Sequence, residues 1–113
     1  MKVKATDIDY AISDDDELSY VYIKWGEQGC YIDITKEENE DDIYCELFDQ
    51  SNGRPFDTIA YELKDKILKI SVQPPESLTR QGLLNTILLD ISSVSFNNDD
   101  LNRTLLHIFS RNL

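Results

Sequence analysis

The chain has 113 residues, of which 41% are hydrophobic and 10% aromatic, and its formal net charge is −11. This apolar content supports a folded core and argues against wholesale disorder, and the length suits one domain, which we place at residues 1–113. The negative charge argues against partners that need clustered cations, namely nucleic acid and anionic membrane, and favours a basic protein.

The negative charge is concentrated in the first half of the chain. Residues 1–50 hold 15 acidic and 4 basic residues, whereas residues 51–113 hold 7 of each. Two acidic runs supply much of the excess: Asp14, Asp15, Asp16 and Glu17 in the first, and Glu37, Glu38, Glu40, Asp41 and Asp42 in the second. Adjacent carboxylates repel one another and cannot be buried unpaired, so both runs are predicted to be exposed, mobile loops. The alternative is that this acidity only aids solubility.

Alternation of apolar and polar side chains predicts four strands in the first half of the chain. The predicted strands are Val3 to Ile12, Leu18 to Trp25, Cys30 to Thr35 and Ile43 to Phe48. Gly26 to Gly29 has the composition of a hairpin loop between the second and third strands. The alternation places one set of side chains inward, Val21, Ile23, Trp25, Cys30, Ile32 and Ile34, and another outward, Tyr20, Tyr22, Lys24, Tyr31, Asp33 and Thr35.

The second half begins with a strong turn signal at Asp49 to Pro55. Two strands follow, Thr58 to Leu63 and Ile67 to Val72, joined by a tight turn at Lys64-Asp65-Lys66. Pro75 to Arg80 fits a short helix that Gly82 could end. The β-branched content of Leu84 to Phe96 favours another strand.

The last segment carries the clearest helical signal. Asn98 can cap the helix, Asp99 and Asp100 fall in its first turn, and Arg111 falls in its last turn. Leu101, Leu105 and Ile108 form an apolar stripe at helical spacing, widened by Leu106 and Phe109. The predicted fold class is therefore α+β: an antiparallel sheet of about six to seven strands with a C-terminal helix packed on one face.

The sequence offers little for catalysis or metal binding. His107 is the single histidine, and it is expected at the edge of the helix packing face rather than as a catalytic base. Neither acidic run has the spacing of a helix–loop–helix calcium site, so only weak calcium binding is expected there. We expect no cofactor and no enzyme activity; the competing hypothesis is an enzyme that uses Asp and Glu. Cys30 and Cys45 are expected as buried thiols, with a disulfide as the alternative if their strands are neighbours.

No segment of the sequence has the features of a signal peptide or a membrane span. The longest mostly apolar stretch, Leu83 to Ile91, falls far short of the roughly 20 residues that a spanning helix needs. The expected location is the cytoplasm.

The middle of the chain resembles a bacterial immunity-protein family, the tenth of the numbered families attached to polymorphic toxin systems. The resemblance lies in the block Ile43-Tyr44-Cys45-Glu46-Leu47-Phe48-Asp49-Gln50-Ser51-Asn52 and in the two strands after it. Pro75-Glu76, Gly82 and the Ile108-Phe109 pair also fit the family's layout. At Arg54 to Asp57 the chain departs from the small residues and glycines usual there, and Asp49 and Ser51 are expected to cap the turn.

The resemblance implies a protein that binds one cognate toxin and blocks it. Many toxins of such systems are nucleases with basic substrate sites, so a basic toxin fits the acidic runs, which are the predicted contact residues. The alternative is an acidic structural or adaptor domain with no toxin partner. The sequence leaves monomer and homodimer open, since out-facing Tyr20, Tyr22 and Tyr31 could support a dimer or pack under the helix.

Overall fold

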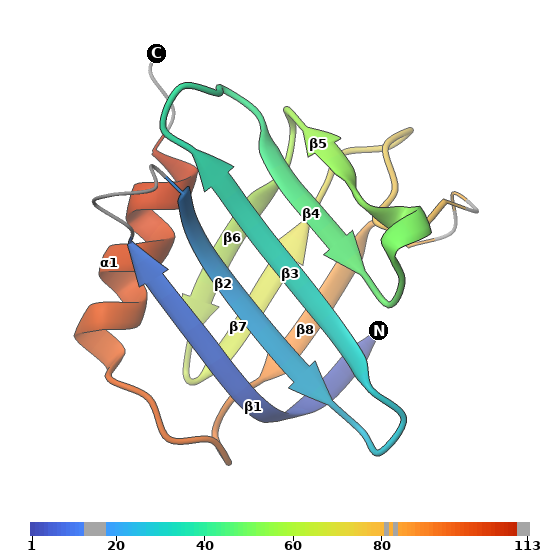
Figure 1. The fold of residues 1–113 in the computed structure, drawn as a ribbon. Helices are drawn as coiled ribbons and strands as arrows, with labels where there is room; N and C mark the ends of the chain where they lie inside the picture. Colours follow the sequence, from blue (N-terminus) through green and yellow to red (C-terminus); the bar gives the residue numbers. More distant parts are fainter. Residues whose placement is uncertain (13–17, 81, 83, 111–113) are drawn as a thin grey trace.

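In the part of the chain that the structure describes, the fold is an eight-stranded sheet followed by one helix. The computed structural model describes residues 1–12, 18–80, 82 and 84–110. In chain order the elements are β1 (Lys2–Ile12), β2 (Leu18–Trp25), β3 (Cys30–Glu37), β4 (Ile43–Leu47), a 3-10 turn η1 (Gln50–Asn52), β5 (Arg54–Phe56), β6 (Ala60–Lys64), β7 (Ile67–Ser71), β8 (Thr86–Asp90) and α1 (Asn98–Phe109). Figure 1 shows this order, with β1 to β4 in front of β6 to β8.

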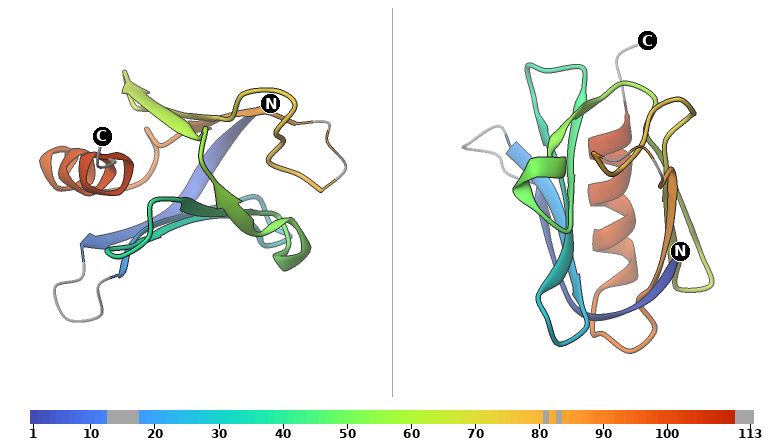
Figure 2. Two further views of the ribbon diagram at one scale, coloured as in Figure 1. Left: turned by 90° about the horizontal axis from the view of Figure 1, so that it is seen from above. Right: turned by 90° about the vertical axis from the view of Figure 1, so that its right-hand side faces the viewer.

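The sheet bends at its first strand and so forms two layers. The strand order is β5-β4-β3-β2-β1-β8-β7-β6, and every neighbouring pair is antiparallel except β1 and β8, which are parallel. The start of β1 pairs with β8, a shift of register follows between Ala5 and Asp7, and the rest of β1 pairs with β2. One strand therefore belongs to both layers, and α1 lies at the open side between them (Figure 2).

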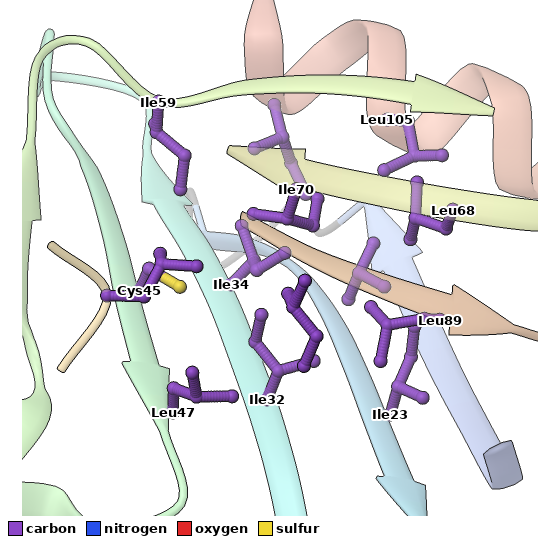
Figure 3. Packing of buried hydrophobic residues seen from close by; sticks show 14 of the residues in the cluster. Ile23, Ile32, Ile34, Cys45, Leu47, Ile59, Leu68, Ile70, Leu89 and Leu105 are labelled. Atoms are coloured by element: carbon purple, nitrogen blue, oxygen red, sulfur yellow. The ribbon is translucent and has the colours of Figure 1, made fainter. Parts of the chain in front are cut away.

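The core fills the space between the two layers. Alternate residues of each strand point into it, as the predicted period of two requires. Figure 3 shows Ile23, Ile32 and Ile34 from one layer meeting Leu68, Ile70 and Leu89 from the other. Leu105 of the helix closes the open side of this core, and its side chain is fully buried.

The helix begins one residue earlier than the sequence predicted. Asn97, rather than Asn98, is the cap, and its side chain accepts a hydrogen bond of 3.0 Å from the backbone N–H of Asp100. The predicted stripe of Leu101, Leu105 and Ile108 is buried. Leu106, which was expected to widen that stripe, is instead 60% exposed. Arg111 lies outside the described residues.

The α+β class is confirmed, but the sheet has eight strands, one pair of them parallel, rather than six to seven antiparallel ones. The missed strand is β5, three residues that include Pro55. It forms one edge of the sheet, and an edge strand tolerates proline because the missing N–H need not pair.

One prediction for the region after β7 was wrong, and another was right about the element but not about its length. No helix forms between Pro75 and Arg80, because the Ser77 hydroxyl binds local backbone: it donates to the Leu84 carbonyl at 2.8 Å and accepts from Leu84 N–H at 3.1 Å. The strand expected at Leu84 to Phe96 is confined to Thr86–Asp90. The carboxylate of Asp90 accepts from the backbone and hydroxyl of Ser92, which ends the ladder in a turn.

Candidate functional site: an acidic tyrosine face

The outer side of the β1–β4 layer carries a group of tyrosines and carboxylates. These residues alternate with the buried ones, so they point away from the helix and the opposite layer. We call this group the tyrosine–acid face; its members are Asp9, Tyr20, Tyr22, Tyr31, Asp33, Tyr44 and Glu46. Figure 1 views the molecule from this side. Tyr20, Tyr22 and Tyr31 therefore do not pack under the helix, and that alternative is wrong.

Strand register brings two carboxylates together at the centre of the face. Tyr22 is opposite Asp33 on the neighbouring strand, and Asp33 is in turn opposite Glu46. Directly opposed residues have Cβ atoms roughly 4.5–5.5 Å apart, and like charges at that distance are destabilising. Burial, and secondarily the charge of Glu46, raise the pKa of Asp33 above its ordinary value.

Two phenols hold Glu46 in place. Tyr31 donates a hydrogen bond to Oε2 of Glu46, and Tyr44 donates one of 2.6 Å to Oε1. The Tyr31 ring is also stacked on Tyr22, with ring centroids 5.6 Å apart. The hydrogen bond to Glu46, and after it burial, raises the pKa of Tyr44 to about 12. Burial, and after it the bond to Glu46, raises the pKa of Tyr31. Both phenols therefore stay protonated at neutral pH.

Gly53 makes room for this arrangement. A Cβ at this position would overlap the Tyr44 hydroxyl and lie 2.9 Å from Oε1 of Glu46. Its φ of −70° is open to any residue, so the reason for glycine here is space rather than backbone conformation. Gly53, which the sequence predicted only as part of a turn, therefore also supports the face.

The charge of the face is largely uncompensated. Tyr20 donates to Oδ2 of Asp9 at 3.0 Å, which orients that carboxylate and leaves its charge in place. In the described part of the layer from Asp7 to Glu46, Lys24 is the single base whose strand position points outward. The face therefore combines aromatic surface with a net negative charge.

The loop between β3 and β4 forms an acidic rim beside the face. A hollow of ≈ 330 Å³ lies there, lined by Thr35, Glu37, Glu40, Asp42, Tyr44 and Pro55. Tyr44 belongs to both the hollow and the tyrosine–acid face, so the two surfaces are continuous. Oε1 of Glu38 lies 2.6 Å from Nε2 of His107, and this contact ties the loop to α1. His107 is partly exposed, which agrees with its predicted place at the edge of the helix packing face.

The predicted contact residues divide into two groups. All five residues of the second run are exposed, as predicted, but Glu37 is the last residue of β3 and not part of a loop; the five are Glu37, Glu38, Glu40, Asp41 and Asp42. Asp14, Asp15, Asp16 and Glu17 lie outside the described residues. Sequence reasoning placed Tyr31 and Asp33 on the outer side but gave them no charged neighbour, and it missed Glu46 and Tyr44. The outward positions in Ile43–Leu47 carried the missing signal, because alternation alone puts Tyr44 and Glu46 on that side.

Neither the two cysteines nor the metal-ligating residue types form a further site in the described part of the chain. Cys45 is buried, and burial raises the pKa of its thiol, whereas Cys30 is only partly buried. Both thiols are free although β3 and β4 are neighbours, because Cys45 is opposite Ile34. Within residues 1–12, 18–80, 82 and 84–110, no group of three or more His, Cys, Asp and Glu side chains could hold a metal ion. Nor does any helix among those residues have the length and apolarity to cross a membrane.

Comparison of the chain with protein-family models, with curated proteins and with solved structures found no match.

Proposed function

We propose that this chain is an immunity protein that binds and neutralises a cognate bacterial toxin through its acidic surface. The resemblance at Ile43 to Asn52 motivates the proposal. The observation that carries it is the tyrosine–acid face with its exposed acidic rim. This surface has the aromatic composition of protein interfaces, and it carries carboxylates that a basic partner would neutralise.

The two parts of this surface suit different roles in binding. Exposed charges at a rim attract an oppositely charged partner at long range and so raise the association rate. Aromatic side chains near the centre of an interface supply most of the energy that holds a complex. A nuclease is a suitable target, because its substrate site is basic, and the acidic surface would compete with nucleic acid for that site.

The test is stopped-flow association with the product of the adjacent toxin gene, at low and at physiological salt. In the rim variant, Glu40→Gln, Asp41→Asn and Asp42→Asn are combined. The matched control combines Glu62→Gln, Asp57→Asn and Asp65→Asn, which removes the same charges from exposed positions outside the β1–β4 layer. We expect slower association for the rim variant at low salt and a smaller difference at physiological salt, where charges are screened over roughly 8 Å.

The dissociation rate should change little in the rim variant, because rim charges act mainly on encounter. The same result is expected when Asp14, Asp15, Asp16 and Glu17 are neutralised. If the association rate changed neither with salt nor with these substitutions, the steering role of the acidic residues would be overturned. Failure to bind the neighbouring toxin, or to protect cells from it, would overturn the immunity function and leave the adaptor hypothesis.

A further inference from the structure

We propose that the tyrosine–acid face is the anchoring site for an arginine of the partner, whose guanidinium would lie on the Tyr22–Tyr31 pair and against the carboxylates of Asp33 and Glu46. This inference rests on the proposed function and deepens it, since it names the partner's contacting group and separates the anchor from the steering rim.

The strand partners of Asp33 are Tyr22 and Glu46, and Lys24, the outward base of this layer, lies opposite Tyr31 instead of opposite a carboxylate. Asp33 and Glu46 are opposite one another on adjacent strands, and both are partly buried. Each oxygen of the Glu46 carboxylate accepts a hydrogen bond from a phenol, and these two bonds restrain its position. The fold thus maintains a like-charge pair, whose burial and mutual repulsion also raise the pKa of Asp33. A cation placed between the carboxylates would turn this repulsion into attraction.

The aromatic neighbours select arginine over lysine. Tyr22 lies directly across from Asp33, and its ring stacks on that of Tyr31. A guanidinium is planar, stacks on aromatic rings and binds carboxylates through two parallel hydrogen bonds, whereas a lysine ammonium is a compact, strongly hydrated point charge. Stacked tyrosine rings beside carboxylates therefore match the planar shape as well as the charge of arginine.

Charge complementarity also selects a basic protein over the other occupants of an exposed sheet face. A second copy of this chain would bring another formal charge of −11 and would set the same carboxylates against one another. Nucleic acid and anionic membranes are repelled for the same reason. The occupant is therefore a basic protein segment that contains arginine.

The first test needs no toxin. The isotope-labelled full chain is titrated by NMR with a short glycine–arginine peptide, and with matched peptides that carry lysine or uncharged citrulline. We expect the largest shifts at Tyr22, Tyr31 and Asp33, and binding about two- to fivefold weaker for the lysine peptide. Bound arginine should also move the titration of the Asp33 carboxyl to lower pH. Shifts confined to residues 37–42, or equal affinity for arginine and lysine, would overturn the proposal.

Two substitutions of equal charge separate the face from the rim. Asp33→Asn should weaken binding of the arginine peptide. It should also speed dissociation of the toxin by about tenfold, which is the effect typical of losing a hydrogen bond to a charged group. Asp41→Asn, in the exposed loop, should leave the dissociation rate unchanged. If Asp33→Asn and Asp41→Asn changed the dissociation rate equally, the proposed anchoring role of the face would be overturned. So would a homodimer in sedimentation that Tyr22→Ala abolishes, because the face would then take a second copy.

The outcomes distinguish this inference from the function on which it rests. If the arginine peptide binds at the face but no toxin binds, the immunity function fails and the arginine site stands. If the toxin binds with a dissociation rate that Asp33→Asn does not alter, the immunity function stands and the anchor fails.

Discussion

Replacing Asp33 by asparagine should stabilise the protein at neutral pH, although it removes a residue from the proposed binding surface. Asp33 is opposite Glu46 on adjacent antiparallel strands and is partly buried. The substitution keeps the size and shape of the side chain but removes the charge, and with it the repulsion across the strand pair. Cross-strand pairs of this kind contribute about 0.2–1 kcal/mol, and the burial of Asp33 favours the upper part of that range.

The stabilisation should depend on pH in a defined direction. The pKa of Asp33 is raised above the ordinary value of 3.8, so the folded protein holds this proton more tightly than the unfolded chain does. Ionised Asp33 therefore lowers the free energy of unfolding as pH rises from 3.8 through the folded-state pKa. Asparagine does not titrate, so its advantage should be full at neutral pH and should shrink as the pH falls through that window.

Urea unfolding of the wild type, Asp33→Asn and Asp41→Asn at several pH values provides the measurement. Asp41→Asn is the matched control, because it removes the same charge from an exposed loop and should change stability by less than about 0.5 kcal/mol. If Asp33→Asn had a lower free energy of unfolding than the wild type, the account of a like-charge pair held by the fold would be refuted. A gain in that free energy that stays the same at acid pH would refute it as well.

Other substitutions test the core and the support of the face. Leu105→Ala should lower the free energy of unfolding by about 2–5 kcal/mol, because burial is lost and a cavity is left. Leu106→Ala, at a 60% exposed position, should change it by less than about 0.5 kcal/mol. Equal melting temperatures of the two variants would contradict the packing of α1. In Glu46→Gln the tyrosinate absorbance of Tyr44 should appear at lower pH than its wild-type pKa of about 12, and an unchanged alkaline titration would argue against the bond. Gly53→Ala should push the Tyr44 hydroxyl away from Glu46, so Tyr44 should again form tyrosinate at a lower pH than in the wild type.

Local patterns in the sequence were sufficient for most of the elements. Leu18 to Trp25 was predicted with the bounds that β2 has, because strict alternation and a glycine-rich hairpin define both its face and its end. The stripe of Leu101, Leu105 and Ile108 was likewise correct, since helical spacing is a short-range property. Leu106 was misassigned because an apolar residue beside such a stripe can be exposed without much cost.

Features that depend on distant parts of the chain could not be predicted. Parallel pairing of β1 with β8 joins segments from opposite ends of the sequence, and no local signal marks it. The opposition of Asp33 and Glu46 needs the register between β3 and β4, which alternation does not give. The acidic runs can be recognised in the sequence because their residues are contiguous. The acids of the face are spread over three strands, so the sequence does not show them as a group.

The shared strand β1 has a consequence for how the chain folds during synthesis. Strands β1 to β5 leave the ribosome first and can pair by short hairpins, but the inner side of that layer stays bare until β7, β8 and α1 arrive. Parallel docking of β8 onto the start of β1 must bring together the two paired strands that were made furthest apart in time, and such non-local pairing is slow. The nascent layer therefore exposes its isoleucine-rich side until β7, β8 and α1 have emerged, so chaperone capture or aggregation at this stage would limit the yield of folded protein.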